Sequence, residues 1–375
     1  MTRLGVIGLG AAAQAFLTPL RRHPDFTIVA ACDPRAEARA EFAAAFDVPV
    51  FDTVDDLLRA GLCEAVYIGT PTELHRDHAM AALEAGQHVL LEKPMCIRAE
   101  DGIALAQAAE ARGLALVVGH SHSHDLPIRK MREIIRSGRL GAVRMVNTWC
   151  YTDWVYRPRR PDELRPELGG GVTYRQGAHQ FDILRSLCGE RVVSVTGHAF
   201  DFDPARPTIG AHSATLTFAN GAIGTAVYNG YGHFATSELT GQVGEWGYPA
   251  TVKPRAAQAA ASPEEELKRK RERAKSAIGN DAPHQPHFGL TLVSCEKGDI
   301  RQSPDGLLIY TAEGCETLPL DNSRSPRELV LDEFAAAIGG EPPLHDGYWG
   351  ASIVSVCDAV LDSARSGKPV AIPQS

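Results

Sequence analysis

Short, almost continuously apolar runs alternate with amphipathic segments over the first 120 residues of the chain. The apolar runs are RLGVIGLG, TIVAACD, EAVYIGTP, HVLLEK and LALVVGH, and we expect helices from Ala11, near 74–85 and near 99–112. Strands that are apolar on both faces are typical of a parallel sheet covered by helices on both sides. The pattern therefore predicts a doubly wound α/β domain, which we place at residues 1–122.

The pattern changes after residue 122. Alternate residues of SATLTF fall on one face, and Asn220-Gly221 joins this segment to AIGTAVYN, which is typical of a β-hairpin. Asp305-Gly306 and Glu313-Gly314 indicate further hairpins. We therefore expect an α+β domain over residues 123–375 with a large, mainly antiparallel open sheet, and we allow for its C-terminal helices packing back on the first domain.

A segment at about 255–285 is predicted to be an insertion. Ser262-Pro263-Glu264-Glu265 has the form of a capping box with proline in the first helical turn. The basic residues that follow have acidic partners at i,i+4 spacing, as in Glu264/Lys268. We interpret the segment as a solvated surface helix rather than a nucleic-acid patch.

Composition narrows the classes of function. A chain of 375 residues with 44% hydrophobic and 22% charged residues is long enough for two globular domains and excludes a disordered chain. The net charge of −8 gives no reason to expect binding to nucleic acid or to an anionic membrane. Eight cysteines without a C-x-x-C pair indicate reduced thiols, so we expect a cytoplasmic protein with a small-molecule partner.

The segment GVIGLGAAA follows the first predicted strand and opens the first helix. Gly8, Gly10 and Ala13 have the spacing G-x-G-x-x-A, which lets backbone amides and a helix N-terminus approach a pyrophosphate. Asp33 closes the next strand, where a carboxylate can bind the adenosine ribose. The combination predicts a Rossmann fold that binds NAD, although Arg35 is suited to the 2′-phosphate of NADP.

Ligands of such sheets bind beyond the carboxyl ends of the strands. Two loops with reactive side chains lie there, TPTELH and EKP. The predicted cofactor-binding residues are Gly8, Gly10, Ala12, Ala13, Asp33, Arg35, Thr70, Pro71, His75, Glu92 and Lys93.

These motifs, together with GGGVTYRQGAHQFD and DEFAAAIGGEPPLHDGYWG, resemble the glucose-fructose oxidoreductase and inositol dehydrogenase (Gfo/Idh/MocA) family over nearly the whole chain. The resemblance implies that Lys93 and His179 are the catalytic residues. It also implies a homodimer or homotetramer formed through the C-terminal sheet.

The chain departs from the family pattern at one position. The family usually has Asp four residues before the histidine, whereas this chain has Arg175. A guanidinium offers a planar fork of donors that suits a carboxylate, so we expect an acidic substrate. Trp154, Tyr156 and Arg157 lie in an arginine-rich loop and combine stacking surfaces with cations, which makes them candidate substrate contacts beside the alternative of an ordinary surface loop.

The segments GHSHSHD and FGLTLVSCEKGDIRQSPDGLLIY extend the resemblance to the phthalate 4,5-cis-dihydrodiol dehydrogenase branch of the family. That branch implies NAD-dependent oxidation of a carboxylated cyclohexadiene cis-diol toward a catechol, a step in aromatic catabolism. A sugar or inositol dehydrogenase is the alternative within the family. A non-catalytic NAD(P)-binding sensor is the alternative from another class.

His120, His122 and His124 alternate and would share one face of a strand, which is compatible with a metal site. We favour histidines that line the cleft between the domains, with His122 contacting substrate, because no matching carboxylate motif accompanies them. We therefore predict no metal.

Overall fold

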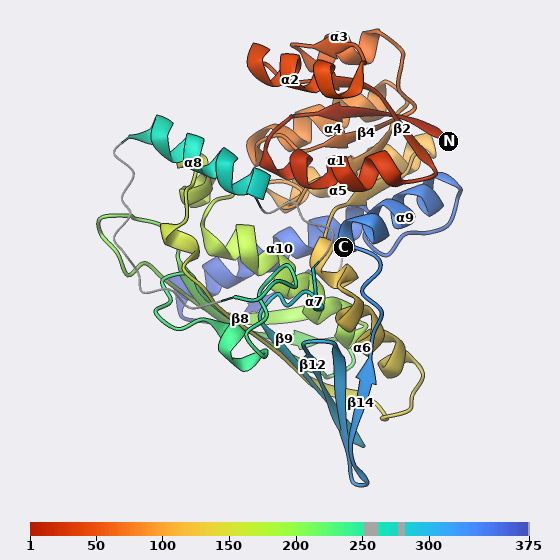
Figure 1. The fold of residues 1–375 in the computed structure, drawn as a ribbon. Coiled ribbons are helices and arrows are strands. Elements are labelled where there is room, and N and C mark those ends of the chain that lie inside the picture. The colour runs from red at the N-terminus through yellow and green to blue at the C-terminus, as the bar shows by residue number, and fades with distance from the viewer. Residues whose placement is uncertain (251–261, 277–281, 374–375) are drawn as a thin grey trace. The chain divides into compact units, whose positions relative to one another are not determined.

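The computed structural model describes residues 1–250, 262–276 and 282–373. The predicted insertion therefore lies partly outside the described residues. The chain divides into two compact units (Figure 1). The N-terminal unit contains Met1–His120 and Arg327–Val354, and the C-terminal unit contains Ser121–Leu267 and most of the later residues.

The N-terminal unit is built on a six-stranded parallel sheet in the order β3-β2-β1-β4-β5-β6. Its strands are β1 (Thr2–Ile7), β2 (Phe26–Cys32), β3 (Val50–Phe51), β4 (Ala65–Ile68), β5 (His88–Leu91) and β6 (Leu116–Val118). Its helices include α1 (Ala11–Arg22), α2 (Ala36–Phe46), α3 (Val54–Arg59), α4 (His75–Glu84) and α5 (Ala99–Arg112). The predicted doubly wound sheet is confirmed, because the strand order reverses direction at β1.

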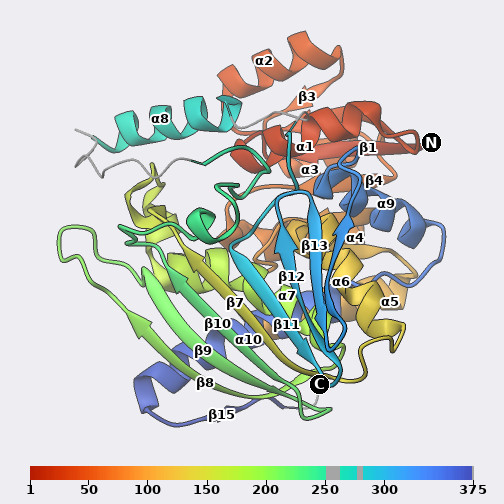
Figure 2. The same ribbon diagram turned by 60° about the horizontal axis from the view of Figure 1, so that its bottom comes forward.

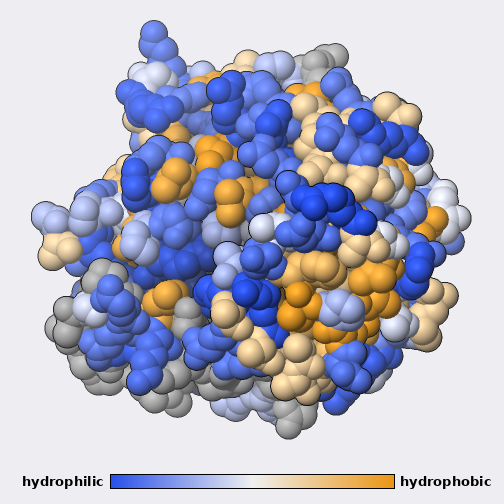
Figure 3. Space-filling model, turned by 90° about the horizontal axis from the view of Figure 1, so that it is seen from above, coloured by the Kyte–Doolittle hydropathy of each residue, from blue (hydrophilic) through white to orange (hydrophobic). Residues whose placement is uncertain are grey.

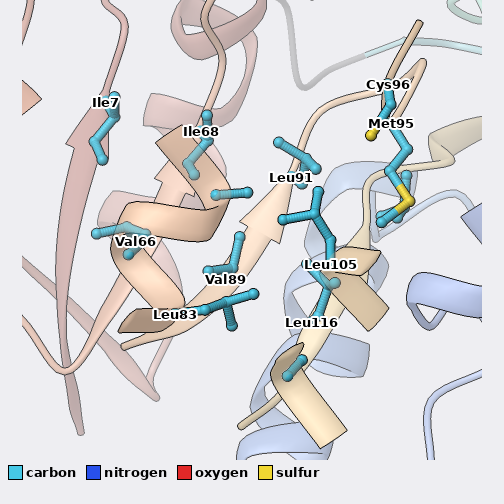
Figure 4. Packing of buried hydrophobic residues seen from close by; sticks show 14 of the residues in the cluster. Ile7, Val66, Ile68, Leu83, Val89, Leu91, Met95, Cys96, Leu105 and Leu116 are labelled. Atoms are coloured by element: carbon cyan, nitrogen blue, oxygen red, sulfur yellow. The ribbon is translucent and has the colours of Figure 1, made fainter. Parts of the chain in front are cut away.

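Two hydrophobic clusters fill the N-terminal unit, as expected for strands with two buried faces. In one of them, Val89 and Leu91 of β5 pack against Leu83 of α4 and Leu105 of α5 (Figure 4). The late helices α9 (Pro326–Ile338) and α10 (Gly347–Ser366) contribute Phe334 and Val354 to these clusters. Residues more than 200 positions downstream of β6 thus complete the core of the N-terminal unit.

The C-terminal unit contains a nine-stranded sheet in the order β14-β13-β12-β11-β7-β10-β9-β8-β15 (Figure 2). The strands are β7 (Val143–Tyr151), β8 (Val192–Phe200), β9 (Ala211–Phe218), β10 (Ile223–Asn229), β11 (Leu290–Cys295), β12 (Gly298–Ser303), β13 (Gly306–Thr311), β14 (Gly314–Pro319) and β15 (Val370–Ala371). All neighbours are antiparallel except β7 and β10. The expected antiparallel sheet and the three predicted hairpins are confirmed.

Helices cover one face of this sheet. Helix α7 (Ala178–Cys188) packs on β7 and β10, and α6 (Leu126–Arg136) packs beside α7. The opposite face carries exposed apolar side chains, since Met145 and Trp149 of β7 are 43% and 44% exposed. The sheet therefore has one face in a core and one accessible face that includes large apolar side chains.

Helix α8 (Pro263–Ser276) begins after Ser262, and one of the two hydrogen bonds of the predicted capping box is present, since the amide of Glu265 donates to Oγ of Ser262 over 3.2 Å. Hydrophilic side chains predominate on the face drawn in Figure 3, and hydrophobic ones form separate patches. Within the described residues, no helix is both long and apolar enough to cross a bilayer.

Candidate active site

The glycine-rich turn joins β1 to α1. Gly8 has φ of +88°, and a Cβ on it would lie 2.9 Å from the Thr70 side chain and 3.0 Å from the Gly69 backbone. Gly10 is the N-cap of α1, and a Cβ there would meet nothing within 4 Å. Ala13 is fully buried against the strand layer. The turn thus leaves open space directly in front of the helix N-terminus, where backbone amides favour an anion.

Asp33 lies at the end of β2 and is only 4% exposed. Its carboxylate accepts hydrogen bonds from the Leu9 amide over 2.9 Å and from both Nε and Nη2 of Arg35 over 2.8 Å. Burial raises the pKa of this carboxyl, but the hydrogen bonds from Arg35 and Leu9 outweigh burial and hold the pKa of Asp33 below its usual value. Asp33 is therefore ionised and partly covered by the 40% exposed side chain of Arg35.

These observations fit a bound dinucleotide. The open space at Gly10 suits a pyrophosphate, because a side chain there would fill it. Ala12 is exposed on the first turn of α1, beside the same opening. An ionised Asp33 suits a ribose diol, while Arg35 stands where a 2′-phosphate would be attracted.

His75 connects the two loops at the carboxyl ends of β4 and β5. Its Nδ1 lies 2.9 Å from the Pro94 carbonyl oxygen and its Nε2 lies 2.9 Å from the Thr70 carbonyl oxygen. The side chain is buried, and Pro71 begins the turn that leads into it. Both ring nitrogens thus face backbone carbonyls, so His75 fixes the turn that carries Lys93.

Lys93 follows β5 and precedes Pro94 through a cis peptide bond. Its amide donates to the carboxylate of Glu92 over 3.2 Å, and the Tyr67 hydroxyl donates to the same carboxylate over 3.0 Å. Burial raises the pKa of Glu92, although the charge of Lys93 and the Tyr67 hydroxyl oppose this effect. The structure therefore joins Tyr67, Glu92 and Lys93 into one group, of which the sequence did not indicate Tyr67.

His179 lies in the first turn of α7, in the C-terminal unit, and is 4% exposed. A π-helical segment, Thr173–Gly177, leads into this turn. Beneath it, Nε2 of His212 faces Oε1 of Gln180 over 3.1 Å, and Nδ1 faces the Thr173 hydroxyl over 3.3 Å. Burial lowers the pKa of His212 to about 3, so a neutral imidazole supports the segment that presents His179.

Arg175 projects from the π-helical segment toward two acidic residues of an upstream loop. Its Nη2 lies 3.3 Å from Glu163 and 3.9 Å from Asp162. Nη2 of Arg160 lies 2.8 Å from the same oxygen of Asp162, Oδ2. Arg175 is therefore a partly buried cation with protein counter-ions, which the sequence did not indicate because these acids lie in a different loop.

The arginine-rich loop is ordered by contacts of its own. Trp154 is 1% exposed, and the Arg159 guanidinium lies 4.0 Å above its ring. The Tyr156 hydroxyl donates to Asp203 over 2.9 Å. Trp154 thus offers little surface to a ligand, whereas Arg157 points into a second charged cluster.

That cluster surrounds His122. Its Nδ1 lies 3.0 Å from Asp125 and its Nε2 lies 3.6 Å from Glu245, whose other oxygen lies 3.7 Å from Arg157. The His122 ring packs edge-on against His179 at 4.6 Å between centroids. The structure therefore brings together His122, Arg157 and His179 among the predicted residues.

His120, His122 and His124 do not share the face of a strand, which was the condition for a metal site built on their alternation. Ser121–His124 forms a 3-10 turn, because β6 ends at Val118. His120 packs instead at 5.9 Å from the ring of His345 in the N-terminal unit.

The chain is similar to known oxidoreductases in both units. Residues 2–120 match the model of an oxidoreductase family with an NAD-binding Rossmann fold, and residues 128–244 match the GFO/IDH/MocA C-terminal domain. A 1-carboxy-3-chloro-3,4-dihydroxycyclohexa-1,5-diene dehydrogenase from Comamonas testosteroni is 37% identical, over 98% of this chain and 95% of the relative. The scyllo-inositol 2-dehydrogenase (NADP(+)) of Bacillus subtilis is 30% identical over 50% of this chain and 52% of its own length.

A crystal structure from Bordetella bronchiseptica RB50 is also similar. It is 37% identical, has a TM-score of 0.93, and the match covers 99% of this chain and 100% of that chain. The fold of both units is therefore that of a solved relative.

Proposed function

We propose that this chain, which belongs to the Gfo/Idh/MocA family of oxidoreductases, oxidises a carboxylated cyclohexadiene cis-diol to a catechol with NAD+ as the hydride acceptor. The observation that carries the proposal is the 37% identity, over 98% of the chain, to a dehydrogenase whose name specifies a carboxylated dihydroxycyclohexadiene. Other family members act on sugars and inositols, so a polyol dehydrogenase is the alternative.

The N-terminal unit is the NAD-binding part of the protein. Gly8, Gly10 and Ala13 would hold the pyrophosphate, and Asp33 the adenosine ribose. We propose NAD rather than NADP, because the ionised Asp33 repels a 2′-phosphate and already holds Arg35. When bound, the nicotinamide supplies the acceptor for a hydride.

In the proposed reaction, Lys93 accepts the proton of one hydroxyl while the hydrogen on the same carbon leaves as hydride. His179 hydrogen-bonds that hydroxyl and relays the proton. The C–O bond becomes a carbonyl, and the resulting ketone becomes a catechol by tautomerisation. The diol thus loses two electrons and two protons in total, one of the protons travelling as part of the hydride.

Arg175 is the proposed anchor for the substrate carboxylate. Its guanidinium can bind an anion in a bidentate fashion, and a substrate carboxylate would compete with Glu163 at 3.3 Å and Asp162 at 3.9 Å. The orientation of the Arg175 guanidinium depends on these two acids being held in place. Glu163 is held by the Arg160 amide, which donates to its carboxylate over 2.7 Å.

The test is a comparison of substrates by the absorbance of reduced nicotinamide. We expect the wild type to oxidise phthalate 4,5-cis-dihydrodiol and the Arg175→Ala variant to lose about 100-fold in kcat/KM, the magnitude of one charged hydrogen-bonded contact. Arg165→Ala is the matched control, since Arg165 lies in the same loop region and is 58% exposed beside Glu167. Turnover of neutral polyols alone, unaffected by Arg175→Ala, would refute the carboxylate assignment.

We also propose a cytoplasmic homo-oligomer. All eight cysteines are free thiols, which suits a reducing compartment. The accessible apolar face of the C-terminal sheet, with Met145 and Trp149, would be covered in a homodimer or homotetramer. Sedimentation of the wild type and of a Trp149→Lys variant tests this proposal.

A further inference from the structure

Glu245 lies between two cations of the C-terminal unit, in a segment without helix or strand. One carboxylate oxygen is 3.6 Å from Nε2 of His122, and the other is 3.7 Å from Nη1 of Arg157. Both cationic side chains are largely buried, at 1% and 19% exposed, whereas the Glu245 side chain is 29% exposed. The Glu245 carboxylate is thus more exposed than either of the two cations that it contacts.

Both partners of Glu245 carry a positive charge. Burial lowers the pKa of His122, but the carboxylates of Asp125 and Glu245 outweigh burial and raise the pKa to about 9. Arg157 is charged throughout the ordinary pH range. Glu245 therefore has a cationic side chain near each of its two carboxylate oxygens.

Each cation has a closer acidic partner than Glu245. Asp125 is 3.0 Å from His122, and Asp153 is 2.7 Å from Arg157. The contacts of Glu245 with His122 and Arg157, at 3.6 and 3.7 Å, are longer than the usual 2.7–2.9 Å of a charged hydrogen bond. Because a carboxylate has about four acceptor sites, Glu245 can accept hydrogen bonds from a ligand while the two cations hold it in place.

The position of this carboxylate relates it to the proposed catalytic histidine. His122 contacts Glu245 through Nε2 and packs edge-on against His179 at 4.6 Å. Phe288 packs against both imidazoles, at 4.4 Å and 4.9 Å, and Trp246 packs against His122 at 5.2 Å. The Glu245 carboxylate and the His179 imidazole therefore both contact the ring of His122. The aromatic side chains around them suit a cyclic substrate.

We propose that Glu245 binds the substrate by accepting a hydrogen bond from the hydroxyl group of the cis-diol that is not oxidised. This inference rests on the proposed function and extends it to recognition of the second hydroxyl. A fixed anion accepts from a hydroxyl and repels a carboxylate, so Glu245 also orients the acidic end of the substrate away from itself. Specificity for a vicinal diol then comes from Glu245, and specificity for the acid comes from Arg175.

The test compares two probes in the full-length enzyme. One is phthalate 4,5-cis-dihydrodiol, and the other is its analogue with a single hydroxyl group. For Glu245→Gln we expect kcat/KM for the diol to fall about 10- to 100-fold, mainly through KM, as for one hydrogen bond to a charged group. The same variant should stay within about threefold of wild type on the single-hydroxyl analogue.

Two further variants make the result specific. Glu238→Gln is the matched control, because Glu238 is an exposed acid seven residues upstream and should leave both probes unaffected. Glu245→Asp keeps the charge and should recover part of the loss on the diol, and it replaces Glu245→Gln if that variant does not fold. NADH binding should be unchanged in each variant, since the cofactor residues belong to the N-terminal unit.

Equal losses on both probes, or no loss on the diol, would overturn the assignment of Glu245. A wild type that binds NADH yet oxidises neither probe is a different outcome. It refutes the proposed function, and the role of Glu245 falls with it.

Discussion

Replacing Gly10 by alanine separates cofactor binding from stability. Gly10 has φ of −81° and ψ of −170°, an extended conformation that alanine adopts readily. The added Cβ meets nothing within 4 Å in the protein. The methyl group would instead occupy the space assigned to the pyrophosphate of NAD.

The magnitudes follow from that geometry. Alanine is a poorer N-cap than glycine, which lowers stability. It also lowers the conformational entropy of the unfolded chain, which raises the free energy of unfolding by about 0.4–1 kcal/mol. The net change in stability therefore stays within about 1 kcal/mol. For a protein of 375 residues that corresponds to a shift in Tm of no more than about 2 °C, because the entropy of unfolding grows with chain length. Overpacking against a bound pyrophosphate costs about 1–3 kcal/mol, or roughly 5- to 150-fold in NAD affinity.

Gly8→Ala should behave differently. Its φ of +88° costs a side chain about 1–2 kcal/mol, and the Cβ lies 3.0 Å from the Gly69 backbone, which cannot move aside like a side chain. Gly86→Ala is the control for backbone strain without a steric clash. Gly86 has φ of +77°, and a Cβ added to it would meet no atom within 4 Å. We expect the Tm to fall most for Gly8→Ala, while Gly86→Ala leaves NAD affinity unchanged.

Calorimetric titration with NAD+ and thermal melts of the three variants provide the assay. If Gly10→Ala binds NAD+ as tightly as wild type, the pyrophosphate does not lie at the N-terminus of α1. The assignment of the glycine turn would then be wrong, whatever the kinetics show.

Two other predictions concern charged groups. Asp33→Asn removes the anion that holds Arg35 at 2.8 Å, so the ratio of kcat/KM for NADP+ over NAD+ should rise at least about tenfold; an unchanged ratio would show that Asp33 does not select the cofactor. The raised pKa of His122, about 9 against 6.5, stabilises the folded protein fully below about pH 6.5, and this stabilisation is lost as the pH rises through 9. The free energy of unfolding of the wild type should therefore fall by up to about 3 kcal/mol over that range, and its Tm should fall with it. Asp125→Asn should show a flatter dependence of Tm on pH and a lower Tm at pH 6. Parallel profiles for the two proteins would contradict the ion pair.

The sequence predicted the elements that local patterns encode. Apolar runs identified the parallel strands, and Asn220-Gly221 identified the hairpin between β9 and β10, because such turns need particular backbone conformations. The glycine turn and Asp33 were also accessible to this reasoning, since their roles depend on fixed spacing along the chain.

The charge partners were not accessible in this way. Glu163 reaches Arg175 and Glu245 reaches His122 only through tertiary packing, and no motif surrounds either acid. Trp154 illustrates the same limit, because its sequence context does not show that Arg159 covers its ring. The alternating histidines are a different case. Alternate residues share a face only on a strand, whereas the chain forms a 3-10 turn after β6.

The glycines of the late helices have a consequence for biosynthesis. A Cβ on Gly347 would lie 2.8 Å from that of Ala106, and one on Gly350 would lie 2.6 Å from the Val118 side chain, so α10 sits tightly against α5 and β6. While the ribosome is still translating the middle of the message, the nucleotide-binding domain lacks this cover and exposes part of its apolar interior. A fragment ending near residue 120 is therefore expected to be poorly folded and prone to aggregate, because it lacks the cover that α10 provides.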